Sequence, residues 1–245
     1  MCDNCNNYWR YYFYSKNILK MKIVHLSQKV ILSEEKLYIP LLSLFCFAVL
    51  IVRMVYTGTF EYRFMGINLI LAWLPYIFAH YLVKIPKKKN TIGKMILFFL
   101  WLIFFPNAAY MITDIYHLSE FPSMPMWYDL IMLLSFAWCG LLLCFYSLKK
   151  MHTRFAFRKN PVVNIFILFS TFFVGGIGIY FGRYARWNSW EIVTQPGNLF
   201  KEFINIISNT NNVMQMFSVA ILFAAFLTIV YLKMFSFGRV TSQKD

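Results

Sequence analysis

The stretch "LFFLWLIFFPNAAYMITDIYHLSE", residues 97 to 120, decides the class of fold. Its first half is apolar and aromatic, as expected of a helix that crosses a lipid bilayer. Pro106 and Asn107 then interrupt the apolar run. Three titratable side chains follow at helical spacing: Asp114, His117 and Glu120. We therefore expect a membrane-spanning helix that ends in a polar cluster.

The whole chain has the composition of a membrane protein. Of its 245 residues, 60% are hydrophobic and 20% aromatic, and the mean hydropathy is +0.55. Soluble domains are about 45–50% apolar. One soluble core of this length would not bury 27 Phe and 16 Tyr. The composition therefore predicts an integral membrane protein.

Six apolar runs reach the roughly 20 residues that a helix needs to cross a bilayer. The predicted spans are 37–57, 64–83, 92–112, 126–148, 162–182 and 213–237. Backbone groups in lipid must bond to one another, so runs of this length are expected to be helices. We predict an all-α helical membrane bundle. It comprises a basic N-terminal segment (1–36), a six-helix domain (37–237) and a short tail (238–245).

The charge distribution predicts the orientation. If the N-terminus is cytoplasmic, 19 of the 24 lysines and arginines fall in the inner segments. This agrees with the positive-inside rule and places both termini in the cytoplasm. Six of the ten acidic residues then fall on the outer side: Glu61, Asp114, Glu120, Asp129, Glu191 and Glu202.

The N-terminal region lacks the apolar core and small-residue cleavage site of a signal peptide. The stretch "MKIVHLSQKV" from Met21 resembles a natural start. We therefore hypothesise that residues 1–20 are an upstream extension.

The formal charge of +14 does not predict nucleic-acid binding, because the basic residues lie in clusters between apolar runs. Cys2 and Cys5 have a redox or metal spacing, but no second pair completes a zinc site. We predict no resident metal and no cofactor. No serine–histidine–acid order, phosphate loop or HExxH is present, so the sequence has no recognised catalytic motif.

The predicted polar cluster begins in the third span. Pro106 is expected to free the carbonyl of Leu102 and to kink the helix. The kink is either satisfied locally or lines a polar cavity. Asn107, Tyr110, Asp114 and His117 share one helical face that leaves the membrane on the outer side. Asp114, His117 and Glu120 could share a metal, but a hydrogen-bonded cluster is the favoured interpretation.

Charged residues near other outer span ends are further candidates. Asp129 lies in the first turn of the fourth span, where the helix N-terminus stabilises an anion. It could instead face Asp114 or an arginine. Arg53, one turn from the outer end of the first span, is expected to extend to the interface.

The segment "GGIGIYFGRYARWNSWEIVTQPGN", residues 175 to 198, follows the same pattern. Gly178 and Gly182 form a close-packing helix motif. Arg183 and Arg186 lie one turn apart on the outer side, near Glu191, and either pair with acids or bind a lipid phosphate. Downstream, "LFKEFINIISN" has apolar residues at the spacing of a short interfacial helix.

The motifs "FFPNAAYMITDIYHL", "WYDLIMLLSFAWCGLLL" and "GIGIYFGRYARWNSWEIVTQP" resemble, in this order, a bacterial multi-pass family called domain of unknown function 1361. The resemblance covers roughly residues 60–232. It implies a bacterial cell-membrane protein without an established activity. The family's usual Pro-Asn-Ala-Pro-Tyr reads Pro106-Asn107-Ala108-Ala109-Tyr110 here, which implies a milder break.

These observations give one main hypothesis and two alternatives. Spans three, four and five converge at their outer ends and form a site from Asn107, Asp114, His117, Asp129, Arg183, Arg186 and Glu191. The site binds or transports a lipid or small polar ligand, and membrane lipids are the expected partners. The alternatives are a membrane-embedded enzyme with Asp114 or His117 as acid–base, and a structural assembly factor. The sequence gives no oligomeric state.

Overall fold

The computed structural model describes residues 36–86, 91–121, 123–155, 161–185, 187 and 194–240. Regular structure in these ranges is helical throughout, with no strand. Six helices are long and apolar enough to cross a membrane: Lys36–Thr57, Arg63–Lys84, Thr91–His117, Met126–Arg154, Val162–Arg183 and Thr210–Phe235. The expected all-α membrane bundle is confirmed. Most of the basic N-terminal segment lies outside the described residues.

The helices follow the predicted spans closely. After the first helix come α2 (Arg63–Lys84), α3 (Thr91–Tyr110), the 3₁₀ helix η1 (Met111–His117), α4 (Met126–Phe155), α5 (Pro161–Arg183), α7 (Pro196–Ser208) and α8 (Thr210–Val240). Helix α4 continues seven residues past the predicted end of its span. The apolar run ends at the first lysines, but lysine and methionine still favour a helix. Helix α7 is the short amphipathic helix predicted before the last span.

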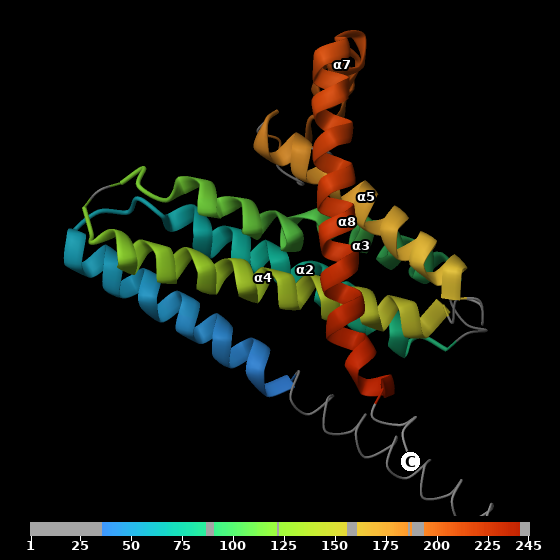
Figure 1. Ribbon diagram of the computed structural model, residues 1–245, viewed down its shortest axis with the longest axis horizontal. Coiled ribbons are helices and arrows are strands. Elements are labelled where there is room, and N and C mark those ends of the chain that lie inside the picture. The colour runs from blue at the N-terminus through green and yellow to red at the C-terminus, as the bar shows by residue number, and fades with distance from the viewer. Residues whose placement is uncertain are drawn as a thin grey trace, which may run out of the picture.

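Helix α4 is the most enclosed element. In its most apolar window 61% of the residues are buried, against 28–33% in the other five spans. Figure 1 shows the first helix, α2 and α4 running side by side, with α8 crossing in front of α4. Helix α5 packs against α3 and α8, and the ring of Tyr231 on α8 contacts Phe145 on α4. The outer faces of the five less buried spans remain apolar, as lipid contact requires.

Two glycines of α5 bring its backbone against α3. A Cβ at Gly178 would lie 2.5 Å from Cγ of Pro106, and a Cβ at Gly182 would lie 3.2 Å from the ring of Tyr110. Only a residue without a side chain fits at Gly178. The close-packing motif and the Pro-Asn motif are therefore the two sides of one interface, and Arg183 follows directly after it.

Pro106 does not end the third span. Helix α3 continues through Pro106 to Tyr110, and the α-helical pattern changes only at Met111, where η1 begins. The change of helix type therefore lies five residues beyond Pro106, which falls inside the span as predicted, and the kink at Pro106 stays a prediction. The proline ring sits against Gly178, which gives it room inside a continuous helix. The tighter η1 carries Asp114 and His117.

Candidate functional site

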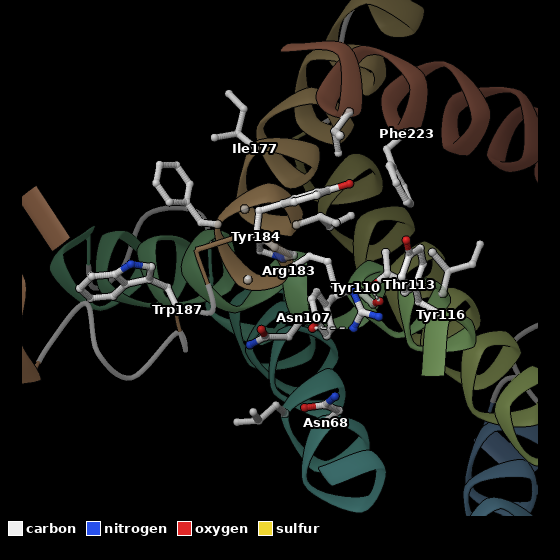
Figure 2. A pocket seen from close by; sticks show the side chains of 18 of the residues that line it. Asn68, Asn107, Tyr110, Thr113, Tyr116, Ile177, Arg183, Tyr184, Trp187 and Phe223 are labelled. Atoms are coloured by element: carbon white, nitrogen blue, oxygen red, sulfur yellow. Dashed lines mark hydrogen bonds between the residues drawn. The ribbon is translucent and has the colours of Figure 1, made fainter. Parts of the chain in front are cut away.

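A cavity of about 1860 Å³ lies among α2, α3, η1, α5, α7 and α8 (Figure 2). Most of its lining is apolar. The polar side chains in the lining are Asn68, Asn107, Tyr110, Thr113, Tyr116, His117, Ser119, Glu120, Arg183, Tyr184 and Trp187. Several of these gather where α3 ends and η1 begins. A concave apolar site with a few converging polar groups is the usual form of a ligand site.

Arg183 is the cation of this polar end. Its Nη1 donates to Nε2 of His117 at 2.9 Å and to the hydroxyl of Tyr110 at 3.4 Å, and lies 3.8 Å from Oδ1 of Asp114. Figure 2 shows the guanidinium reaching toward Tyr110. The guanidinium carbon also lies 5.2 Å from the ring centroid of Tyr116. One nitrogen therefore makes the polar contacts that join α5 to α3 and η1.

His117 lies between Arg183 and Glu120. Arginine can only donate, so Nε2 of His117 accepts and the ring proton is on Nδ1. Nδ1 then donates to Oε2 of Glu120. The ring of Phe64 packs 4.9 Å from the imidazole centroid and holds its orientation. His117 is thus a neutral imidazole with both nitrogens engaged.

Asp114 lies behind the cavity wall. It is 1% exposed, and its Oδ2 accepts a hydrogen bond of 3.0 Å from Nδ2 of Asn68 on α2. A carboxylate buried this deeply requires a compensating partner, and Arg183 supplies the positive charge. Asp114 therefore positions Arg183 and Asn68 rather than contacting the cavity itself.

Much of the remaining lining is apolar. It includes Val174 and Ile177 on α5, Phe200 and Phe203 on α7, and Phe223 on α8. Helix α7 is joined to the end of α5 by a hydrogen bond from the indole of Trp187 to Glu202. The cavity thus has an apolar body and a polar end.

A second charged cluster surrounds Arg53. This side chain is buried and not extended to the interface as predicted, because it has anionic partners within the protein. Its Nε donates to Oδ1 of Asp129 at 2.7 Å, and its Nη2 donates to Oδ2 at 3.2 Å. Its Nη1 donates to Glu61 at 2.9 Å, and the ring of Tyr62 lies 4.3 Å from the guanidinium.

The Arg53 cluster (Arg53, Glu61, Tyr62, Ser123 and Asp129) holds the loop beside the cavity. Nη2 of Arg53 also donates to the carbonyl of Phe121, and the hydroxyl of Tyr62 donates to the carbonyl of His117. The hydroxyl of Ser123 donates to Glu61 at 2.7 Å. This bond and the bond from Arg53 hold the pKa of the Glu61 carboxyl below its usual range. Burial raises the pKa of Tyr62 to about 12.

The predicted site residues therefore divide into three groups. Asn107, Asp114, His117 and Arg183 gather at the polar end of the cavity, although Asp114 does not line it. Asp129 pairs with Arg53 and does not line the cavity, so α4 contributes to the other cluster. Arg186 and Glu191 lie outside the described residues.

Two contributors were not recognised in the sequence. Asn68 is a polar residue within an otherwise apolar span, which marks it as a side chain that needs an internal partner. Arg53 carried the same signal, since buried charges in a membrane pair with one another. Within the described ranges, no three His, Cys, Asp or Glu side chains gather as a metal site.

Comparison with known proteins gives one finding. A family model described as "Protein of unknown function (DUF1361)" matches residues 67–230, which include every described helix from α2 to α8 at least in part. No curated protein and no solved structure matches the chain.

Proposed function

The chain belongs to the DUF1361 family of proteins of unknown function, and we propose that this multi-pass membrane protein binds an amphiphilic lipid in its cavity. The headgroup contacts the polar end at Arg183, Tyr110 and His117. The hydrocarbon part occupies the apolar body between α5, α7 and α8.

The observation that carries this proposal is the size and division of the cavity. Its volume of about 1860 Å³ exceeds the roughly 300–1,000 Å³ of sites for small molecules. A ligand that fills it is therefore larger than a typical metabolite. An apolar body with one polar end matches an amphiphile, because the hydrocarbon part meets apolar side chains and the polar part meets hydrogen-bonding groups.

The same proposal includes the location of the protein. The positive-inside pattern supports an orientation with η1 and the polar end of the cavity on the outer side. The family resemblance supports a bacterial cell membrane. In this orientation the ligand is a lipid of the outer leaflet, either held in place or passed to another acceptor.

Acid–base catalysis on a lipid substrate is the second candidate. His117 lines the cavity and is oriented by Glu120, as a general base often is. However, its Nε2 already accepts a hydrogen bond from Arg183. The lone pair that would remove a proton is occupied, so the geometry favours binding over catalysis.

Native mass spectrometry of the purified protein tests the proposal. We expect a retained lipid in the wild type and at least about tenfold weaker retention in Arg183→Gln, because charge-assisted hydrogen bonds contribute about 1.5–3 kcal/mol. Arg63→Gln is the matched control, since Arg63 is exposed at the outer end of α2 and does not line the cavity.

Two results would contradict the proposal. One is a wild-type protein that retains no lipid in a detergent that preserves its fold. The other is equal retention by Arg183→Gln and Arg63→Gln, with both variants as abundant and as thermally stable as the wild type.

A further inference from the structure

We infer that the bound lipid is a two-chain phospholipid with a zwitterionic headgroup, one that carries a phosphate and an amine. This inference rests on the proposed function, because it identifies the class of lipid for the same cavity. It follows from the donors and acceptors that remain open at the polar end, from the charge balance there and from a crevice beside the cavity.

Arg183 presents an open donor edge. Its hydrogen bonds and its ion pair with described residues all use Nη1, and no described residue forms a hydrogen bond or ion pair with Nε or Nη2. The Nε–Nη2 edge of a guanidinium binds two oxygens of a phosphate or carboxylate side by side. Because Arg183 lines the cavity, this edge is suited to an oxyanion of the ligand.

Glu120 presents the matching acceptor. Its Oε2 is bonded to His117, whereas Oε1 forms no hydrogen bond or ion pair with a described residue, and the side chain is about half exposed in the lining. Arg183 and Glu120 therefore stand on opposite sides of one imidazole ring. A donor edge and a carboxylate on the two sides of one imidazole ring can hold a phosphate and an amine that are joined by a short linker.

The charge balance favours a headgroup without net charge. Besides Tyr110 and Tyr116, four titratable side chains meet here from α5, η1 and the following loop: Arg183 is positive, Asp114 and Glu120 are negative, and His117 is neutral because its Nε2 accepts from Arg183. The described cluster thus has one more negative than positive charge. A net-anionic headgroup would add like charge beside Glu120, whereas a zwitterionic one places its amine there. Like charges at this range repel even when water screens them partly.

A crevice beside the cavity can take a second chain. A hollow of about 290 Å³, lined by Ile112, Leu222, Phe223 and Phe226, shares Ile112 and Phe223 with the main cavity. Leu222 is 69% exposed and Phe226 is 48% exposed, so this hollow opens to the surrounding lipid. One acyl chain in the main cavity and one beside Phe223 would suit a two-chain lipid.

The test compares two lipids that differ only in the headgroup. The delipidated wild type is incubated with equal amounts of dioleoyl phosphatidylethanolamine and dioleoyl phosphatidylglycerol, and the bound fractions are read by native mass spectrometry. The chains are identical, so the ratio reports the headgroup alone. We expect phosphatidylethanolamine to be preferred by up to about fivefold, the effect of one partly exposed ion pair.

Variants identify the responsible groups. Glu120→Gln is expected to bring the ratio near one, whereas Arg183→Gln lowers binding of both lipids because both carry a phosphate. Arg63→Gln leaves the ratio unchanged. Glycerophosphoethanolamine, which has the headgroup without chains, is expected to compete only weakly.

The outcomes separate the two proposals. If neither lipid binds the wild type, the proposed function fails. If both bind but phosphatidylglycerol is equal or preferred, or if Glu120→Gln keeps the wild-type ratio, the zwitterionic headgroup is wrong while lipid binding stands. If the soluble headgroup competes as well as the lipid, the ligand is a free phosphate ester and the two-chain assignment fails.

Discussion

Replacing Arg53 by methionine is expected to lower the free energy of unfolding by about 3–5 kcal/mol, the cost of leaving a buried charge without its partner. The substitution removes both hydrogen bonds to Asp129, whose side chain is only 3% exposed. Glu61 loses the same arginine at little cost, because it is 26% exposed and keeps its bond from Ser123. Nearly all of the loss therefore comes from Asp129.

The double variant Arg53→Met with Asp129→Leu tests this origin. Removing both charges leaves two apolar side chains in an apolar place, so we expect most of the lost stability to return. Asp129→Asn alone is expected to cost less than Arg53→Met. Arg53 would still be bonded to Glu61 and to the carbonyl of Phe121.

Thermal unfolding in detergent can be followed with a thiol-reactive fluorophore, because Cys46, Cys139 and Cys144 are buried until the bundle opens. The background carries Cys2→Ser and Cys5→Ser so that only these three thiols report. We expect Tm to fall by about 6–20 °C in Arg53→Met.

The matched control for this experiment is Arg63→Met, which removes an exposed arginine near the same end of the bundle. Equal Tm values for Arg53→Met and Arg63→Met would refute the reasoning. A double variant no more stable than Arg53→Met would refute it as well, because the cost would then not lie in the unpaired carboxylate.

Three further predictions use the same assay. Gly178→Ala is expected to cost about 1–3 kcal/mol, since its Cβ would lie 2.5 Å from a rigid proline ring; Gly175→Ala is the control, because its Cβ meets a phenylalanine ring at 3.3 Å. The hydrogen bonds that lower the pKa of Glu61 stabilise the folded protein at every pH above 4.5, the ordinary pKa of this group. This stabilisation is lost as the pH falls through the lowered pKa, so Glu61→Gln should flatten the decline of Tm in acid. Tyr62→Phe should cost about 0.5–1.5 kcal/mol by removing one hydrogen bond to a backbone carbonyl.

Each of these has a result that would count against it. Gly178→Ala and Gly175→Ala could lower Tm equally, which would mean that the proline ring moves freely. An acid decline that is just as steep in Glu61→Gln would assign the decline to other groups. A larger loss in Tyr62→Phe than in Arg53→Met would show that the hydroxyl bond, rather than the arginine, holds the loop.

The six spans were predictable from the sequence because crossing a bilayer needs only length and apolar composition. The ends were less predictable where charged residues continue a helix, as in α4 after Leu148. Asp114, His117 and Arg183 were recognised as candidates because neither lipid contact nor apolar packing explains a titratable side chain at the end of a span. Their proximity, with 3.8 Å between Asp114 and Arg183, depends on the packing of α5 against α3.

The sequence raised an arginine as one alternative partner of Asp129, but it did not identify that arginine as Arg53. In a soluble protein the polar face of a helix marks the side that faces water. In a bilayer, the face toward lipid and the face toward the core are both apolar, so the rotation of each helix leaves little trace in the pattern. The two residues are 76 positions apart, and only the arrangement of the first helix beside α4 brings them together. For the same reason Asn68 did not stand out as a partner of Asp114.

The contact between Gly178 and Pro106 has a consequence for the position of Arg183 in the cavity. Arg183 lies five residues beyond Gly178, which is roughly 7–8 Å along a helix axis. Two residues without polar side chains therefore fix the level of the guanidinium along α5 relative to α3. Inserting a single residue between Gly178 and Arg183 would turn the arginine by about 100° around α5, away from Tyr110 and His117. The register of this apolar contact, as much as any charge, sets the position of the polar groups that the proposed headgroup would meet.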